Sequence, residues 1–330
     1  MWKLLIRINK NLVYAIPALM VAGLIFGAVV DQKLVASMKL LIVPLTFLMV
    51  YPMMVTLNID HLRKGLEPRI QGSAIFINFA VIPFVALYLG KFFFPDQPYM
   101  ALGLLLAALL PTSGMTISWT GFAKGNMGAA INMTVIGLTL GSLATPIYVS
   151  RLLGATVEVN FMKVMQQIAL IVFLPMALGY ITRRILLTKY TLAEFKEKIA
   201  PRFPALSTIG VLGIVFTAMA LKAKTIAADP AQLLVIFVPL LLLYFINFSL
   251  STLAGRFFFS RENGIALVYG TVMRNLSIAL AVAINAFGEE GADAALVIAM
   301  AYIIQVQSAA WYVRFTDFFF GKEVAAQDLC

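Results

Sequence analysis

Ten long apolar segments, separated by short polar connections, dominate this sequence of 330 residues. They are 12–30, 34–57, 72–94, 99–122, 127–153, 161–182, 204–223, 232–254, 264–287 and 292–315. A helix needs about 20 mostly apolar residues to cross the hydrocarbon of a bilayer, because each residue adds only about 1.5 Å to its length. The pattern therefore predicts an all-α, polytopic membrane protein with ten transmembrane helices, which form a single membrane domain over residues 1–330.

The composition excludes several kinds of function. Apolar residues make up 62% of the chain and charged residues 12%, against about 25% charged residues in a soluble domain. Membrane topology explains the formal charge of +10, so no nucleic-acid partner is expected. One histidine, His61, and one cysteine, Cys330, leave no general base for a catalytic triad and no ligand cluster for a metal. We expect a protein that is not an enzyme, without catalytic residues, metal site or cofactor.

Lysine and arginine residues are distributed unevenly between the two sides of the predicted spans. Seventeen of the 25 lie on the side that holds both termini, seven lie on the other side, and Arg274 lies within the ninth span. Basic residues accumulate in the cytoplasmic connections of membrane proteins. We therefore expect a multi-pass protein of the plasma (inner) membrane with both termini in the cytoplasm.

The spans fall into two halves that carry matching interruptions. The polar connection 183–204 leaves five spans on each side, and an odd number of spans gives the halves opposite orientations. The fourth span is broken at Pro111, Thr112, Ser113 and Gly114, and the ninth carries Gly270, Thr271, Arg274, Asn275 and Ser277. The spacing predicts two inverted five-helix repeats, about 1–160 and 161–330, with crossed broken helices four and nine.

Broken helices inside a membrane are typical of a solute site. A break is tolerated in hydrocarbon only beside protein or a water-filled cavity, and half-helix N-termini carry partial positive charge. The alternative is a proline kink that only shapes packing, but the polar residues at both breaks favour a site. The candidate substrate-binding residues are Thr112, Ser113, Thr116, Thr120, Thr271, Arg274, Asn275 and Ser277. Weaker candidates, interpreted as packing residues, are Asn78, Asn132, Thr134, Gln305, Gln307 and Ser308.

Arg274 is the one ionisable residue predicted deep in a span, because all 15 acidic residues fall in connections, at span edges or in the tails. Sodium sites and proton relays in membranes usually use a carboxylate. A buried guanidinium without a counter-charge costs at least ~2.5 kcal/mol, which makes it a functional candidate. It would attract the anionic part of a solute or stand in for a coupling cation. The alternative is that it only anchors carbonyls exposed by the breaks.

Three segments resemble the bile acid:sodium symporter superfamily, which includes the arsenical-resistance (arsenite efflux) permeases. Residues 111–126 resemble its fourth helix and 274–283 its ninth-helix motif, while 47–54, Trp119 and 123–126 resemble the arsenical-resistance branch. The resemblance implies a panel subdomain and a core subdomain, interleaved along the chain, with a solute pathway between them. It also implies a small-molecule or oxyanion substrate and a surrounding lipid bilayer, and it leaves a homo-oligomer open.

The sequence departs from that superfamily at five functional positions. Thr112 stands where arsenite permeases carry a membrane-embedded cysteine, and Ser277 where they carry a glutamate. Gly270, Arg274 and Ile117 stand where sodium-coupled relatives carry Glu, Gln and Asn. We therefore expect a secondary transporter that moves a small anionic or oxyanionic solute by alternating access, without the usual sodium sites. The alternatives are a sodium-coupled organic-anion symporter and a non-transporting membrane scaffold or receptor.

Overall fold

The computed structural model describes residues 2–56, 67–154, 157, 160–228, 230–288 and 290–321; His61 and Cys330 lie outside this part of the chain. Within it, the backbone is helical, apart from connections and one isolated bridge between Pro111 and Arg274. The α-helices are α1 Trp2–Lys10, α2 Leu12–Val29, α3 Gln32–Ser37, α4 Ile42–Thr56, α5 Pro68–Ile75, α6 Ile82–Phe93, α7 Pro98–Leu109, α8 Gly114–Phe122, α9 Met127–Leu153, α10 Phe161–Ile168, α11 Leu174–Lys189, α12 Leu192–Glu194, α13 Arg202–Ala228, α14 Ala231–Phe258, α15 Arg261–Val272, α16 Leu276–Phe287 and α17 Gly291–Phe320.

The lengths and apolar composition of these helices are those of a polytopic membrane protein. Six helical stretches are long and apolar enough to cross a bilayer. They are Pro68–Phe93, Met127–Leu153, Phe161–Lys189, Leu192–Lys224, Leu233–Phe258 and Gly291–Phe320. Four shorter apolar helices accompany them, Tyr14–Val29, Val43–Thr56, Pro98–Leu109 and Leu276–Phe287, and the last two are halves of interrupted helices. The predicted all-α fold is confirmed.

Two of the long stretches contain a π-helical turn directly before a proline. The turn η3, Phe76–Val81, joins α5 to α6, and η4, Ala169–Phe173, joins α10 to α11. Pro83 and Pro175 follow these turns in the first positions of the next helix. Because proline has no N–H and its ring crowds the preceding turn, a wider local turn lets the helix continue past it.

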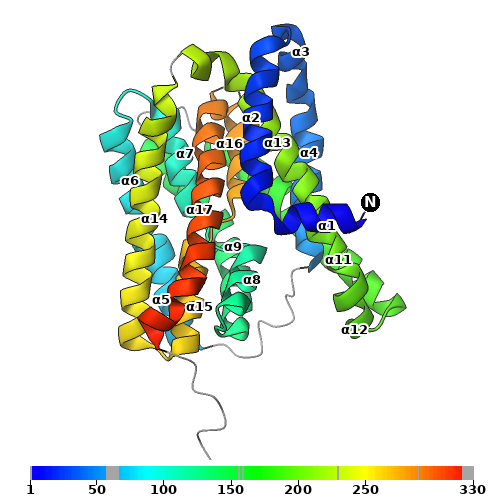
Figure 1. Cartoon of the computed structure of the whole chain (residues 1–330), viewed down its shortest axis with the longest axis vertical. Helices are drawn as coiled ribbons and strands as arrows, with labels where there is room; N and C mark the ends of the chain where they lie inside the picture. Colours follow the sequence, from blue (N-terminus) through cyan, green and yellow to red (C-terminus); the bar gives the residue numbers. More distant parts are fainter. Residues whose placement is uncertain are drawn as a thin grey trace, which may run out of the picture.

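The helices form two groups, which Figure 1 shows side by side. The α13 group consists of α1, α2, α4, α11 and α13, on the right of the figure. The α17 group consists of α5 to α9 and α14 to α17, on the left. Each group takes helices from before and after the middle of the chain. Between the groups, α16 packs against α4 and α17 packs against α2 and α13.

Glycines bring the backbones of the α13 group into close contact. A Cβ added at Gly27 of α2 would lie 2.1 Å from the carbonyl oxygen of Ala220 in α13. A Cβ at Gly210 of α13 would lie 2.5 Å from the backbone nitrogen of Met49 in α4. Small residues at such crossings let helices pack closely where no hydrophobic effect drives them together.

Two helix boundaries differ more from the sequence prediction than the others do. The apolar segment 34–57 begins with the short helices α3 and η1, Met38–Leu41, so that α4 starts only at Ile42. At the other boundary, α11 continues beyond the predicted end at Thr182 to Lys189, inside what the sequence indicated as a connection. The extra turns are stabilised locally, because the Arg184 guanidinium lies 5.1 Å from the centre of the Tyr180 ring and its Nε donates to Tyr180 Oη at 2.9 Å.

Candidate solute-binding site

The two interruptions meet in the interior of the α17 group. The first separates α7 from α8, and the second separates α15 from α16. The N–H of Thr112 donates to the carbonyl oxygen of Met273 at 2.7 Å, and the N–H of Asn275 donates to that of Leu110 at 2.8 Å. Pro111 and Arg274 thus face each other in an antiparallel bridge. Each break satisfies backbone groups that the other exposes, which is what an apolar environment demands.

Gln305 of α17 holds the other edge of the second break. Its Oε1 accepts the N–H of Arg274 at 2.7 Å, and its Nε2 donates to the Arg274 carbonyl oxygen at 3.1 Å. Tyr244 of α14 donates its hydroxyl to the same Oε1 at 2.9 Å. The sequence interpretation of Gln305 as a packing residue was incomplete. This side chain forms the two hydrogen bonds with the main chain of Arg274 that a neighbouring β-strand would otherwise form.

The first break is anchored on α9. Thr112 has a φ of 65°, in the left-handed region that a β-branched residue rarely adopts. Its hydroxyl lies 2.6 Å from the carbonyl oxygen of Pro111 and 3.2 Å from that of Thr134 in α9. Gly137 and Gly141 make room for this contact. A Cβ at Gly137 would lie 2.8 Å from Thr112 Oγ1, and a Cβ at Gly141 would lie 2.7 Å from Pro111 Cδ.

Both half-helices that follow the breaks begin with a side-chain cap. Ser113 caps α8, where its Oγ accepts the N–H of Met115 at 3.2 Å and its own N–H donates to Thr116 Oγ1 at 3.1 Å. Asn275 caps α16, where its Oδ1 accepts the N–H of Ile278 at 3.2 Å. Two helix N-termini therefore begin beside the paired breaks. Both bring partial positive charge to this region.

The carbonyls at the end of α15 are occupied by amide donors. Asn78 Nδ2, from the π turn η3, donates to the Gly270 carbonyl oxygen at 3.0 Å. Asn247 Nδ2, from α14, donates to the Thr271 carbonyl oxygen at 2.9 Å. Thr271 itself is buried, and its hydroxyl lies 2.6 Å from that of Ser251. Two carbonyl oxygens at this helix end therefore already accept a hydrogen bond, while the Oδ1 of Asn78 is buried without a donor in the described structure.

A cavity of about 150 Å³ lies between the two helix groups, next to the breaks. The α17 group lines it with Ser113, Gly114, Met115, Ser118, Arg274, Asn275, Leu276, Ser277 and Tyr302. The α13 group lines it with Asn9, Met53, Pro204, Ser207, Thr208 and Val211. The hydroxyls of Ser277 and Tyr302 are hydrogen-bonded to each other. The cavity is therefore lined by hydroxyl and amide side chains from both sets of helices, together with one guanidinium.

The Arg274 guanidinium is buried without a compensating charge. The residue is 3% exposed, and among the described residues no group accepts a hydrogen bond from Nη1 or Nη2. Within the same part of the chain no Asp or Glu side chain is buried. Asn275 Nδ2, beside it, is likewise buried without an acceptor in the described structure. Donors without acceptors next to a cavity create a strong preference for an anion.

The structure places the eight candidate residues in two sets. Ser113, Arg274, Asn275 and Ser277 line the cavity. The other four do not line it: Thr112, Thr116, Thr120 and Thr271 are buried, with their hydroxyls bonded inside the protein. A buried threonine that returns its hydrogen bond to its own helix or to a neighbouring one supports packing and caps rather than offering a free donor.

The sequence prediction missed the wall that the α13 group contributes. Ser207 donates its hydroxyl to the Met49 carbonyl oxygen, and Thr208 donates to Asn9 Oδ1 at 2.7 Å. The adjacent polar pair Ser207 and Thr208 within an apolar span was the available signal. Tyr302 gave no signal, because an aromatic residue in a span is ordinary.

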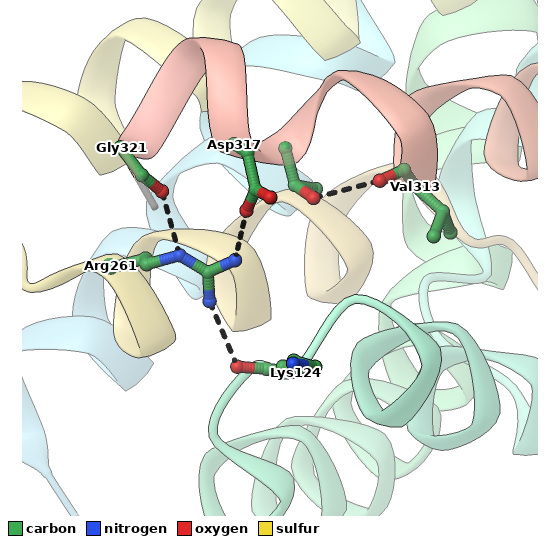
Figure 2. A network of polar contacts seen from close by, with 6 residues as sticks. Lys124, Arg261, Val313, Asp317 and Gly321 are labelled. Atoms are coloured by element: carbon green, nitrogen blue, oxygen red, sulfur yellow. Dashed lines mark hydrogen bonds and ion pairs between the residues drawn. The ribbon is translucent and has the colours of Figure 1, made fainter. Parts of the chain in front are cut away.

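A polar network ties the far ends of the interrupted helices together (Figure 2). At the start of α15, Arg261 Nη2 lies 2.6 Å from Asp317 Oδ1, and its Nε donates to the Gly321 carbonyl oxygen at 2.9 Å. Its Nη1 donates to the Lys124 carbonyl oxygen at 3.3 Å, in the turn after α8. The two interrupted helices are therefore joined at their breaks and again at this end.

Comparison with known proteins gives a consistent result. The profile of the sodium bile acid symporter family matches residues 43–229, more than half of the chain. The uncharacterized protein YbaS of Bacillus subtilis is 26% identical over 232 residues, 70% of this chain and 74% of its own length. The arsenical-resistance protein Acr3 of Corynebacterium glutamicum is 24% identical over 263 residues, 74% of this chain and 70% of its own length.

A third relative comes from an animal. The sodium/bile acid cotransporter 7-B of Xenopus laevis is 25% identical over 195 residues, 56% of this chain and 54% of its own length. The bacterial and the animal relatives agree with the family resemblance that the sequence indicated. The chain therefore belongs to the sodium bile acid symporter family, a family of membrane transporters.

Proposed function

We propose that this protein is a secondary transporter that moves a small anionic or oxyanionic solute by alternating access. The observation that carries the proposal is the buried Arg274 guanidinium, whose terminal nitrogens have no acceptor among the described residues. It lies beside the N-termini of α8 and α16, in the lining of a cavity between two helix groups. A guanidinium and two helix N-termini favour a carboxylate or an oxyanion.

The contacts at the breaks support transport without the usual sodium sites. Asn78 and Asn247 occupy carbonyl oxygens at the end of α15, and the breaks occupy one another's. A sodium ion near Arg274 would also meet a fixed positive charge at close range. In this proposal the guanidinium takes the place of a coupling cation. Pure anchoring of carbonyls by Arg274 is less well supported, because Nη1 and Nη2 bond to none in the described structure.

The solute in this proposal is small. The cavity of about 150 Å³ lies below the range of about 300–1,000 Å³ that holds drug-sized ligands. Thr112, which is buried against α9, offers no soft thiolate for arsenic. The alternative function is a sodium-coupled organic-anion symporter, which the similarity to the sodium/bile acid cotransporter of Xenopus favours.

The membrane topology that we propose has ten crossings and both termini in the cytoplasm of the plasma (inner) membrane. Residues 1–160 and 161–330 would form inverted repeats, and each would give two spans to a panel subdomain, the α13 group, and three to a core subdomain, the α17 group. In support, α2 and α4 pack beside α11 and α13, whereas α7 and α9 pack beside α15 and α17.

A thermal-shift screen of the purified protein tests the anion site. Arsenite, antimonite, small carboxylates and bile acids are compared on the wild type, on Arg274→Gln and on the exposed-arginine control Arg69→Gln. We expect a small anion to raise the melting temperature of the wild type and of Arg69→Gln but not of Arg274→Gln. An equal shift in all three proteins would contradict a role for Arg274 in anion binding.

Transport of the stabilising anion into proteoliposomes tests the coupling. We expect equal initial rates with an inward sodium gradient and with sodium replaced by choline. Strict dependence on sodium would support the symporter alternative instead. Absence of transport under every gradient, with binding intact, would favour a non-transporting receptor.

A further inference from the structure

A second cavity lies on the opposite side of α17 from the solute site, in a groove between α14 and α17. Its volume is about 670 Å³, and most of its lining side chains are aromatic or aliphatic. The rim is widely exposed, with Phe245 70% exposed on α14 and Trp311 62% exposed on α17. The groove opens on the outer surface of the α17 group, the surface that faces hydrocarbon in a membrane protein.

The floor of the groove is built so that its polar atoms are already satisfied. Tyr312 lies between Phe248 and Phe319, with ring centroids 4.9 Å and 5.6 Å away. Its hydroxyl is hydrogen-bonded to the hydroxyl of Thr252. The floor therefore presents ring faces and methyl groups, and an apolar chain could lie on it without displacing a hydrogen bond.

One end of the groove is positively charged. Arg256, in the last turn of α14, lines the groove and is exposed. Within the described part of the chain, no carboxylate forms an ion pair with Arg256. The nearby Asp317 of α17 is paired with Arg261. An apolar groove that ends at a single unpaired guanidinium matches a ligand with a long hydrocarbon part and an anionic head.

We propose that this groove binds a phospholipid with an anionic headgroup, with an acyl chain along Trp311 and Leu253 and the phosphate on Arg256. A guanidinium binds a phosphate with two parallel hydrogen bonds. A net negative headgroup, as in phosphatidylglycerol, adds attraction that the neutral headgroup of phosphatidylcholine lacks. This inference does not depend on the proposed transport function, because it concerns a different surface of the protein.

A lipid in the groove would lie next to side chains that contact α15, the helix that leads to the second break. Tyr312 of the floor packs edge-on against Tyr269 of α15, with ring centroids 5.9 Å apart. Tyr269 in turn donates its hydroxyl to the Ala309 carbonyl oxygen of α17 at 3.2 Å. The lipid would thus cover the side chains that hold α15 against α17.

Trp311 supplies an intrinsic reporter for this test. The chain has three tryptophans, so Trp2→Phe together with Trp119→Phe leaves Trp311 as the one emitter. The protein is reconstituted into phosphatidylcholine vesicles that contain either brominated phosphatidylglycerol or brominated phosphatidylcholine with identical acyl chains. Bromine quenches a tryptophan at contact, so the quenching at each mole fraction measures how strongly each lipid occupies the groove.

We expect phosphatidylglycerol to be enriched about fivefold over phosphatidylcholine at Trp311, the effect of one basic residue near an anionic headgroup. Arg256→Gln should abolish the preference, Arg256→Lys should retain part of it, and the exposed control Arg69→Gln should leave it unchanged. Ser249→Phe, which fills the groove and leaves the charge, should reduce quenching by both lipids.

Three outcomes would overturn the proposal. Equal quenching by the two lipids in the wild type would show an ordinary lipid-facing surface. A preference for phosphatidylglycerol that survives Arg256→Gln would place the anionic lipid elsewhere. Quenching by neither lipid would show that protein, such as a second copy of this chain, covers the groove.

Discussion

Gln305 forms hydrogen bonds with both backbone polar groups of Arg274, so one side chain of α17 fixes the main chain that carries the buried guanidinium. The bonds lie on the side opposite Pro111, and the short extended segment at the second break is therefore held along both edges. The position of the charge beside the cavity depends on this arrangement, because Nη1 and Nη2 themselves form no hydrogen bond with described residues.

Gln305→Leu is expected to destabilise the protein and to weaken any effect of bound anion. Leucine is close to glutamine in size, but it leaves the N–H and the carbonyl of Arg274 without their side-chain partner, at a cost of about 1–3 kcal/mol each. Thermal melting with and without the stabilising anion measures both effects. Gln307→Leu is the matched control, because Gln307 is an exposed glutamine on the same helix. Equal losses in the two variants would contradict the assignment.

Arg274→Met is expected to raise thermal stability in anion-free buffer while it removes the response to anions. A buried charge without a partner is unfavourable, so an apolar side chain of similar length should recover on the order of 2.5 kcal/mol. Melting curves in buffer of low anion content measure the change. A clear loss of stability would indicate that the guanidinium has a structural partner in the folded protein.

Arg261→Met should lower thermal stability, in contrast to Arg274→Met. This residue joins α15 to Asp317 and Gly321 of the α17 end and to Lys124 after α8, through three contacts of its guanidinium. Because the site is partly open to solvent, we expect a loss of about 1 kcal/mol rather than the larger loss typical of a buried pair. Asp317→Asn removes the ion pair and leaves the other two contacts. Comparison of the melting temperatures of the two variants therefore gives the part of the stability loss that is due to the ion pair.

Gly141→Ala tests the docking of the first break on α9. The new Cβ would lie 2.7 Å from Pro111 Cδ and 3.0 Å from the Leu109 carbonyl oxygen, and overpacking of this kind costs about 1–3 kcal/mol. Gly72→Ala is the control, since a Cβ there meets nothing within 4 Å and alanine favours a helix by up to about 1 kcal/mol. Melting of the two variants should shift in opposite directions. A neutral Gly141→Ala would show that the break can move away from α9.

The sequence located both interruptions. Proline and glycine within an apolar run marked the first, at Pro111 and Gly114, whereas the polar residues Arg274 and Asn275 marked the second. It also identified Arg274, since a lone charge in such a run is conspicuous. The cavity wall formed by Asn9, Ser207 and Thr208 could not be predicted, because which face of α13 meets the other group is decided by packing against α2 and α4.

Some side chains were placed in the site although they serve the backbone. Thr116 and Thr120 are polar residues near a break, and nothing in their spacing separates a cap from a ligand. The late start of α4 was hidden for a similar reason, because the residues before Ile42 are as apolar as those within the helix. The composition of a segment indicates whether it lies in an apolar environment, but it does not predict which hydrogen bonds its residues form.

Two main-chain hydrogen bonds, from Asn275 to the Leu110 carbonyl and from Thr112 to the Met273 carbonyl, have a mechanical consequence. Neither interruption can serve as an independent hinge, because bending one would break the hydrogen bonds that its backbone forms with the other in an apolar surrounding. Any motion that turns the cavity from one face of the bilayer to the other must carry both segments in register. In the proposed alternating access, sliding would occur at the surface between the two helix groups, and it would have to break the Lys222–Asp293 ion pair and the Asn285–Thr46 hydrogen bond that cross this surface.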